Sequence, residues 1–296
     1  MIDTVELMKQ VGRIRILTSK MVEERLSGDY HSVFKGQGLE FDEVREYLPG
    51  DDVRAIDWNV TARMGHPYIK RYTEERELTV LFAIDISGSQ CFGSLDRSKA
   101  ELTAELACLL ALSAVRNQDK VGLVLFSDGI NLCLPARKGR TAVMRLVREV
   151  LASGETRRAT DLAGALRFIS RIQKKRAVIF LISDFMDTGY WKDLRIMARK
   201  HDVICCPISD PREFSLPDAG LLDVQDPETG ALFQIDTGDP DMRNAFRQAG
   251  ESARDELLTK FRQYGIDSVF LSTDRPVAHD ILRLFRQREH RIGKRG

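Results

Sequence analysis

The stretch LTVLFAIDISGS, residues 78–89, decides the fold. It opens with an almost continuous apolar run and then reaches a carboxylate, Asp85. Such runs are typical of a strand that is buried on both faces of a parallel sheet. Two more follow, Val121–Phe126 and Ala177–Ser183, and the second is again followed by a carboxylate, Asp184. The sequence therefore predicts an α/β protein built on a buried, mostly parallel sheet.

Helical patterns alternate with these strands from residue 78 onward. This alternation predicts a doubly wound sheet with helices on both faces. Right-handed crossovers then bring the carboxyl ends of the strands to one edge. The expected helices cover about 96–116, 140–152, 161–174, 190–200, 240–263 and 276–288. The other expected strands are an edge strand at Ile130–Leu134, strands at 203–208 and 267–271, and a hairpin excursion within 219–236.

The first 76 residues have a different character. Apolar residues at helical spacing predict a helix over 4–27. Glycines and prolines then separate short apolar pieces, for which we expect strands at Leu39–Phe41, Val53–Trp58 and Tyr68–Tyr72. Trp58 is expected in the core. The predicted domains are 1–76, an N-terminal helix and small β element; 77–289, the α/β domain; and 290–296, a basic tail that we expect to be solvated.

Charge and cysteine content narrow the class of protein. The net charge is +1, which indicates neither nucleic acid nor an anionic membrane as a partner. The five cysteines form no C-x-x-C pair, which favours reduced thiols, and the adjacent Cys205 and Cys206 are expected to be buried. The N-terminus lacks a signal-peptide pattern, and no stretch approaches the ~18 apolar residues of a membrane span. We therefore expect a cytoplasmic protein.

Oxygen-bearing side chains follow two of the buried strands. Asp85, Ser87 and Ser89 lie in the loop after the first strand, Asp184 follows the strand at 177–183, and Thr160 precedes a helix. Ligands of open α/β sheets bind outside the carboxyl ends of the strands. A set made only of oxygens selects a hard cation, with Mg²⁺ expected and Ca²⁺ or Mn²⁺ possible. Two carboxylates and three neutral hydroxyls would leave the ion electrophilic enough to accept a carboxylate from a partner.

These five residues resemble a metal-ion-dependent adhesion site. The D-x-S-x-S pattern after an apolar strand, a threonine about 70 residues later and an aspartate after the next such strand are similar to the von Willebrand factor A domain. The resemblance implies that Ser87 and Ser89 contact the metal directly, and that Asp85, Thr160 and Asp184 contact it directly or through water. Thr160 departs from the family pattern, because the second threonine often found two residues later is absent.

A narrower resemblance covers most of the chain. It is to the domain of unknown function 58 family, whose members join an N-terminal element to a von Willebrand factor A-like fold. This resemblance implies a non-enzymatic adaptor or co-chaperone that works beside a MoxR-type AAA+ ATPase or binds another von Willebrand A-like protein. The motifs that carry it are Gly36-x-Gly38-x-Glu40-Phe41, Arg45-x-Tyr47, Gly50-Asp51-Asp52-x-Arg54-x-Ile56-Asp57-Trp58, Ala62-Arg63 and Glu74-Glu75-Arg76.

The sequence lacks residues that two other chemistries would need. A phosphate loop would need a lysine after Gly93, where the sequence has Ser94. Aspartyl-phosphate chemistry would need a second aspartate at the position of Ser87. A metal-dependent phosphoester hydrolase stays open as the alternative, with Asp128 or Asp161 as its general base. A hydrogen-bonded loop that binds no metal also stays open.

Overall fold

The computed structural model describes 39–74, 77–94, 97–153 and 159–293, together with ten residues before position 35. Those ten are Val11, Gly12, Ile14, Thr18, Ser19, Met21, Val22, Tyr30, Val33 and Phe34. The helix expected over 4–27 falls mostly outside the described residues. The chain divides into two compact units, of which one contains Met1–Val33 with Thr79–Gly296 and the other Phe34–Leu78.

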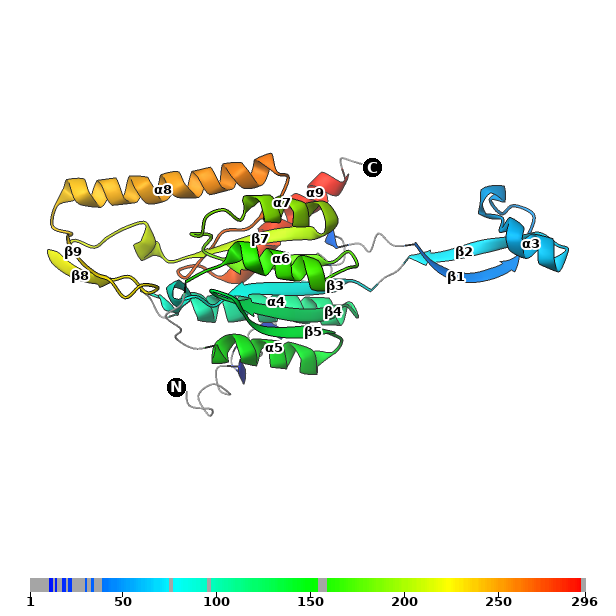
Figure 1. The fold of residues 1–296 in the computed structure, drawn as a ribbon, viewed down its shortest axis with the longest axis horizontal. Helices are drawn as coiled ribbons and strands as arrows, with labels where there is room; N and C mark the ends of the chain where they lie inside the picture. Colours follow the sequence, from blue (N-terminus) through cyan, green and yellow to red (C-terminus); the bar gives the residue numbers. More distant parts are fainter. Residues whose placement is uncertain are drawn as a thin grey trace. The chain divides into compact units, whose positions relative to one another are not determined.

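A mostly parallel sheet forms the centre of the larger unit (Figure 1). Its strands lie in the order β10-β7-β6-β3-β4-β5, and β11 also pairs with β7. Only β5 runs antiparallel, at the edge where the sequence places an edge strand. β3 is central, and all but its first residue are buried, as expected of a continuous apolar run. The strands are β3 Thr79–Asp85, β4 Lys120–Phe126, β5 Ile130–Arg137, β6 Val178–Ser183, β7 Asp202–Ser209, β10 Asp267–Ser268 and β11 Leu271–Ser272.

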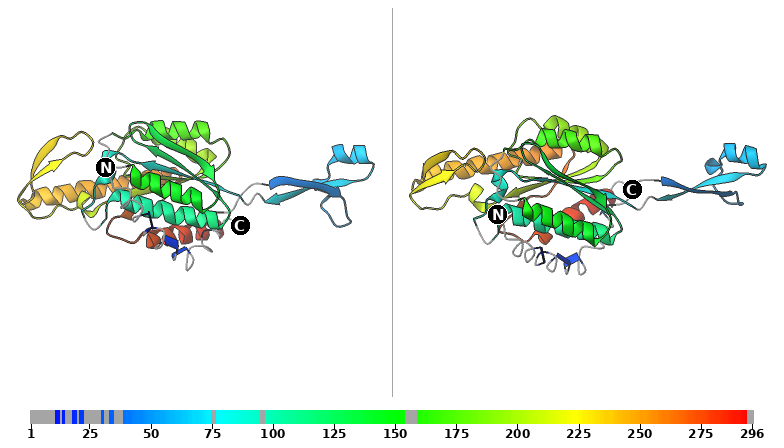
Figure 2. Two further views of the ribbon diagram at one scale, coloured as in Figure 1. Left: turned by 90° about the horizontal axis from the view of Figure 1, so that it is seen from below. Right: turned by 60° about the horizontal axis from the view of Figure 1, so that its bottom comes forward.

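Helices cover both faces of this sheet. Helices α6 and α7 lie on one face, whereas α4, α5 and α9 lie on the other (Figure 2). The doubly wound α/β fold expected from the sequence is therefore confirmed. α4 begins with a reciprocal capping box between Ser98 and Glu101, which satisfies orphan backbone donors of its first turn. The helices are α4 Lys99–Arg116, α5 Arg140–Ala152, α6 Leu162–Ile172, α7 Trp191–Lys200, α8 Pro240–Gln263 and α9 Val277–Gly293.

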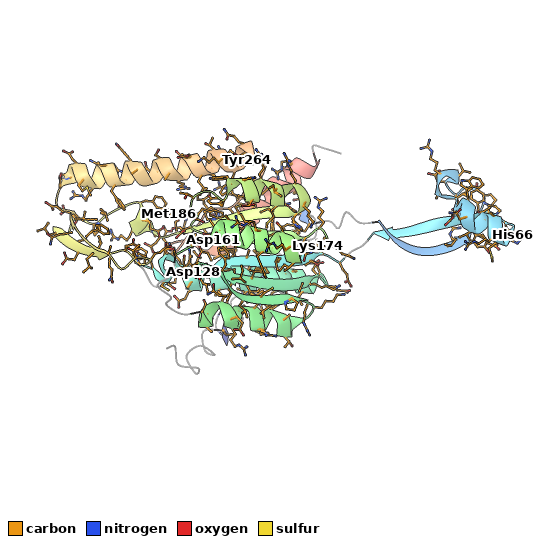
Figure 3. All side chains as sticks on the ribbon, in the orientation of Figure 1. His66, Asp128, Asp161, Lys174, Met186 and Tyr264 are labelled. Atoms are coloured by element: carbon orange, nitrogen blue, oxygen red, sulfur yellow. The ribbon has the colours of Figure 1, made fainter. Side chains whose placement is uncertain are left out.

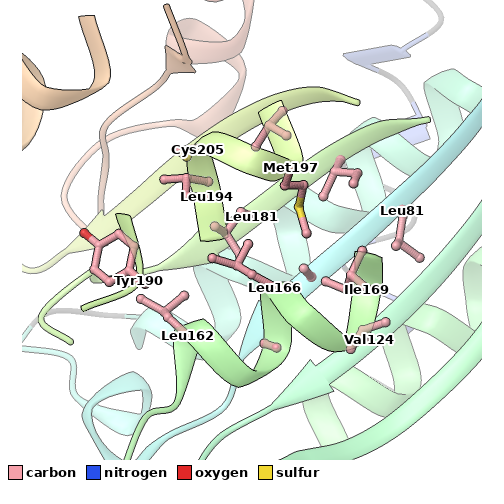
Figure 4. Close-up of a cluster of buried hydrophobic side chains, with 14 of the residues drawn as sticks. Leu81, Val124, Leu162, Leu166, Ile169, Leu181, Tyr190, Leu194, Met197 and Cys205 are labelled. Atoms are coloured by element: carbon pink, nitrogen blue, oxygen red, sulfur yellow. The ribbon is translucent and has the colours of Figure 1, made fainter. Parts of the chain in front are cut away.

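The core on the α6–α7 face is apolar and continuous (Figure 4). Leu166 and Ile169 of α6 and Leu194 of α7 are fully buried against strands β4 and β6. On the opposite face of the sheet, the rings of Phe82 and Phe180 stack 5.5 Å apart. Each fully buried side chain of this size contributes about 1.5–3 kcal/mol to folding. This packing fixes the strand ends at which polar side chains gather.

A small hairpin lies at the carboxyl end of the sheet (Figure 1). Its strands are β8, Leu221–Gln225, and β9, Leu232–Asp236, which pair antiparallel. The sequence predicts this hairpin and its turn at Pro227–Gly230. Asp226 closes the turn, because its side chain accepts hydrogen bonds from the backbone N–H of Glu228 at 2.8 Å and from the Thr229 hydroxyl at 2.6 Å.

The smaller unit differs from its expected strands in one place. Strands β1, Leu39–Glu46, and β2, Tyr68–Glu74, pair antiparallel as a hairpin. The strand predicted at Val53–Trp58 is wrong, since a 3₁₀ turn, Val53–Ala55, and helix α3, Trp58–Met64, replace it. Asp52 and Asp57 accept hydrogen bonds from the first N–H groups of these two helices and so fix their starts.

Trp58 and Arg45 belong to motifs that carry the family resemblance in the sequence. Trp58 was expected in a core, but its side chain is 70% exposed, so that expectation is wrong. Arg45 forms a two-pronged ion pair with Asp51 inside the unit, at 2.8 and 2.9 Å. Arg54 and Arg63 are exposed, whereas the side chains of 74–76 lie outside the described residues.

The observed division of the chain differs from the expected boundary at 76. The segment before residue 34 groups with the α/β unit, because the Tyr30 hydroxyl donates to the buried Asp119 at 3.0 Å and Thr18 contacts Cys108 at 3.2 Å. At the other end, α9 continues to Gly293, so part of the predicted basic tail is helical. Among the described residues, no helix has the length and apolar character needed to cross a membrane.

Candidate functional site

Asp85 ends β3 at the centre of the sheet and is almost fully buried. Its Oδ1 accepts a hydrogen bond from the Ser87 backbone N–H at 2.9 Å, and its Oδ2 accepts one from the Ser183 hydroxyl at 2.7 Å. Burial raises the pKa of Asp85 to about 6, and the nearby charge of Asp184 adds to this rise, while hydrogen bonds from Ser183 and Ser87 oppose it. A cation beside this carboxyl would offset the cost of its buried charge.

A chain of short contacts links the β3 loop to the end of β6. The Ser87 and Ser89 hydroxyl oxygens lie 3.1 Å apart, and Ser89 donates to Asp184 Oδ2 at 2.7 Å. The loop is fixed beside β4 because the Ile86 N–H donates to the Phe126 carbonyl at 2.8 Å. The structure therefore brings four of the five predicted site residues together, from two neighbouring strands.

Thr160 lies in the loop before α6. The next residue, Asp161, donates its backbone N–H to the Ser127 carbonyl at the end of β4, at 2.7 Å, and Leu162 donates to Asp187 at 2.9 Å. These two bonds connect the start of α6 to the segments that follow β4 and β6. The Thr160 hydroxyl itself donates to Glu228 in the β8–β9 turn, at 3.2 Å.

Lys99 is a site residue that sequence reasoning missed. Its side chain is fully buried, and its Nζ lies 3.3 Å from Asp184 Oδ2 and 2.6 Å from Glu213 Oε1. Burial lowers the pKa of Lys99, but the charges of Asp184 and Glu213 outweigh burial, and the net pKa is raised. Lys99 lies in the first turn of α4, where the helix dipole disfavours a positive charge. This unfavourable position is the feature of the sequence by which Lys99 could have been identified.

Glu228 is the second residue that the sequence did not identify, since its segment reads only as a turn. Its half-buried carboxylate accepts from Thr160 and lies within electrostatic reach of Asp184, Asp226 and Asp187. Burial raises the pKa of Glu228 and the three carboxylates raise it further, while the hydrogen bond from Thr160 lowers it. The β8–β9 turn thus places one more carboxylate beside the predicted site.

The donor set fits a hard cation better than a soft one. Within the described residues, no three His, Cys, Asp or Glu side chains gather as a metal cluster, so an ion here would depend on hydroxyls and water. Adjacent oxygens around Mg²⁺ are about 2.9 Å apart, given metal–oxygen bonds of about 2.0–2.1 Å. The oxygen–oxygen distances of the Ser87–Ser89 pair, 3.1 Å, and of the Ser89–Asp184 pair, 2.7 Å, are near this value. Hydrogen bonds between such oxygens have similar lengths.

A buried amide in the same loop supports this fit. The Gln90 side chain is 3% exposed, and within the described part of the chain neither its Nε2 nor its Oε1 has a hydrogen-bond partner. Buried polar groups are normally paired with protein or with ordered water. Because Mg²⁺ retains several of its waters when it binds protein, a hydrated ion would bring hydrogen-bonding groups into this loop.

The two aspartates considered as general bases already have structural partners. Asp161 caps α6, where its Oδ1 accepts from the Gly164 N–H at 2.7 Å. Asp128 accepts from the Ser127 hydroxyl at 3.0 Å. Both lie at the same end of the sheet as Met186, and Lys174 lies at the opposite end (Figure 3). The Asp161 carboxylate in particular stabilises the start of α6.

Comparison with solved structures finds proteins of low sequence identity to this chain. The hypothetical protein BatB from Bacteroides thetaiotaomicron is 16% identical and aligns over 71% of this chain and 98% of its own, with a TM-score of 0.44. An aerotolerance-related membrane protein from Bacteroides fragilis is 16% identical over 72% and 99%, with a TM-score of 0.46. The SpRpn10 VWA domain is 11% identical over 70% and 94%, with a TM-score of 0.38.

Comparison with curated sequences gives matches over almost the full length. An uncharacterized protein of Mycobacterium tuberculosis is 30% identical over 290 residues, which cover 97% of this chain and 91% of that protein. An uncharacterized protein of Mycobacterium bovis matches to the same extent. The model of one family, described as protein of unknown function DUF58, matches residues 43–256. The chain therefore belongs to the DUF58 family.

Proposed function

We propose that this protein is a non-enzymatic, Mg²⁺-dependent protein-binding module. Asp85, Ser87, Ser89, Thr160 and Asp184 would hold the ion, and a carboxylate from a partner would complete its coordination. The observation that carries the proposal is the contact chain Ser87–Ser89–Asp184, which joins the ends of two neighbouring strands through oxygen atoms alone. Mg²⁺ would supply an electrophilic centre for a negatively charged group.

The surroundings of Asp184 suit a protein partner. A cavity of about 420 Å³ begins at Asp184 and continues between the β6–α7 loop and α8. Phe185, Trp191 and Phe270 are among its apolar lining residues. Met186, two residues after Asp184, also lines the cavity and is 79% exposed (Figure 3). A partner that offers a carboxylate to the ion could bury these apolar groups at the same time.

The partner is proposed to be a MoxR-type AAA+ ATPase, with another von Willebrand A-like protein as a second candidate. The family resemblance in the sequence supports this choice. The protein would then act in the cytoplasm as an adaptor or co-chaperone, and any change in metal occupancy would change its association with the ATPase.

Affinity capture tests this proposal. The intact protein is used as bait for a purified MoxR-type ATPase from the same genome, in Mg²⁺ and in EDTA. We expect capture in Mg²⁺ only, and loss of capture by the Ser87→Ala, Ser89→Ala double variant. Ser153→Ala, which removes a hydroxyl at the end of α5, is the matched control and should behave as wild type. Equal capture in EDTA, or turnover of a phosphoester that Asp85→Ala abolishes, would contradict the proposal.

A further inference from the structure

A cavity of about 450 Å³ lies at the edge of the central sheet where β10 is the last strand. Three segments line it: the second half of α8, residues 265–270 with β10 among them, and one face of α9. From α8 it receives Arg254, Leu258 and Arg262, which share a helix face because they are four residues apart. Pockets for small molecules usually have about 300–1,000 Å³, so this cavity is large enough for such a ligand.

The lining of this cavity is strongly basic. It contains two carboxylates, Asp267 and Asp280, but six arginines. The whole chain has a net charge of only +1, so the excess of positive charge is local. Like charges gathered around one cavity repel one another, and an anion between them would offset this cost. The six are Arg254, Arg262, Arg275, Arg283, Arg288 and Arg291.

Two of the arginines are occupied by carboxylates of the sheet. The buried Arg288 contacts Asp202 at 2.5 Å and Asp267 at 3.4 Å. Arg291 contacts the same Asp267 carboxylate at 2.5 Å. Asp280 lies in the first turn of α9, where the helix dipole favours its negative charge. The acidic residues of the lining are therefore already balanced.

The other four arginines have weak partners or none. Arg262 and Arg283 are exposed, and within the described part of the chain neither forms an ion pair. The Arg254 guanidinium lies over the Phe270 ring, 5.3 Å from its centroid. Arg275 has one long ion pair, at 3.7 Å, with its exposed neighbour in the sequence. These four side chains come from α8, α9 and the loop between β11 and α9, so an anion in the cavity could contact several of them.

We infer that this cavity binds a small ligand that carries two or more phosphate groups. The planar guanidinium presents a fork of N–H donors that matches the oxygens of a phosphate. Because the arginines come from separate segments, a row of phosphates fits them better than a single phosphate does. A nucleotide and an inorganic polyphosphate share this chemistry. The inference needs no metal ion and does not rest on the proposed function.

Calorimetric titration of the intact protein with tripolyphosphate and with ATP tests the inference. The titrations are done in EDTA at low salt, so that no metal ion at the Asp85 loop can bind the phosphates. We expect both anions to bind, and added NaCl to weaken the binding. The Arg262→Ala, Arg283→Ala double variant should bind both at least about tenfold more weakly, because it loses charge-assisted hydrogen bonds to phosphate.

The Arg247→Ala, Arg286→Ala double variant is the matched control. It removes the same charge from exposed positions of α8 and α9 that do not line the cavity, and it should bind as wild type does. Thermal unfolding shows that both double variants are folded.

The relative affinities identify the source of the phosphates. Tighter binding of ATP would indicate a nucleotide, and equal affinities would indicate a ligand recognised by its phosphates alone; both support the inference. Absence of binding in wild type, or equal weakening in the two double variants, would overturn it. Binding of a single-stranded RNA without binding of either small anion would also overturn it. Asp85→Ala should bind both anions as wild type does, so this site and the proposed metal site can fail separately.

Discussion

Replacing Asp85 with Asn should stabilise the metal-free protein near pH 7.5 while removing metal binding. The Asp85 carboxyl has its pKa raised from 3.8 to about 6, first by burial and then by Asp184. The folded state therefore holds its proton more tightly than the unfolded state does. Its contribution to stability is fully present below pH 3.8 and is lost as the pH rises through 6.

The size of the effect follows from the shift. A difference of about two pH units corresponds to about 3 kcal/mol at pH 7.5. Asn keeps one oxygen for the Ser87 N–H, but it loses an acceptor for the Ser183 hydroxyl. A lost hydrogen bond costs about 0.5–1.5 kcal/mol. We therefore expect a net gain of about 1.5–2.5 kcal/mol.

Urea unfolding in EDTA at pH 7.5 and at pH 4 measures this gain. Asp85→Asn should be the more stable protein at pH 7.5, and the gain should vanish or reverse at pH 4, where wild-type Asp85 is protonated. Addition of Mg²⁺ should stabilise wild type and leave the variant unchanged. A variant that is less stable than wild type at pH 7.5, or a difference that does not change with pH, would refute the reasoning.

Three further predictions concern the neighbours of this residue and the smaller unit. Calorimetric titration should show Mg²⁺ affinity falling as the pH drops through 6, because Asp85 takes up a proton that the ion must displace; a constant affinity from pH 5 to 8 would contradict this. Lys99→Met should lower unfolding free energy by about 3–5 kcal/mol in EDTA, since it leaves Asp184 and Glu213 without their buried cation, and Mg²⁺ should restore part of the loss. Trp58→Ala should change thermal stability by under about 0.5 kcal/mol, as expected of an exposed side chain, and a large loss would show that Trp58 is part of a core after all.

The centre of the larger unit was predictable because its inner strands are almost continuously apolar. Strands such as β3 and β6 are buried on both faces, so each consists of an unbroken run of apolar residues. Such a run predicts a buried strand from the local sequence alone. The strand at Val53–Trp58 was wrong because a short apolar pattern competed with two local caps, Asp52 and Asp57. In segments this short, a side chain that caps a helix start decides whether the chain forms a helix or a strand.

The candidate site was predictable only where residues follow strand ends. Asp85, Ser87, Ser89 and Asp184 belong to that class, since parallel neighbours place their carboxyl ends together. Lys99 and Glu228 reach the site from a helix start and from a hairpin turn. Glu228 is 44 positions after Asp184 in the sequence. No local sequence pattern predicts that the β8–β9 turn lies near Asp184 at the carboxyl end of the sheet. Contacts of this kind depend on the whole fold.

The most direct measurement is a crystal structure of the protein grown with Mn²⁺, with anomalous scattering used to locate the ion. We expect one anomalous peak bonded to the Ser87 and Ser89 hydroxyls, with Asp85, Asp184 and Thr160 in contact directly or through water. An empty loop at saturating Mn²⁺, with Ser89 still donating to Asp184 and no density between them, would contradict the account.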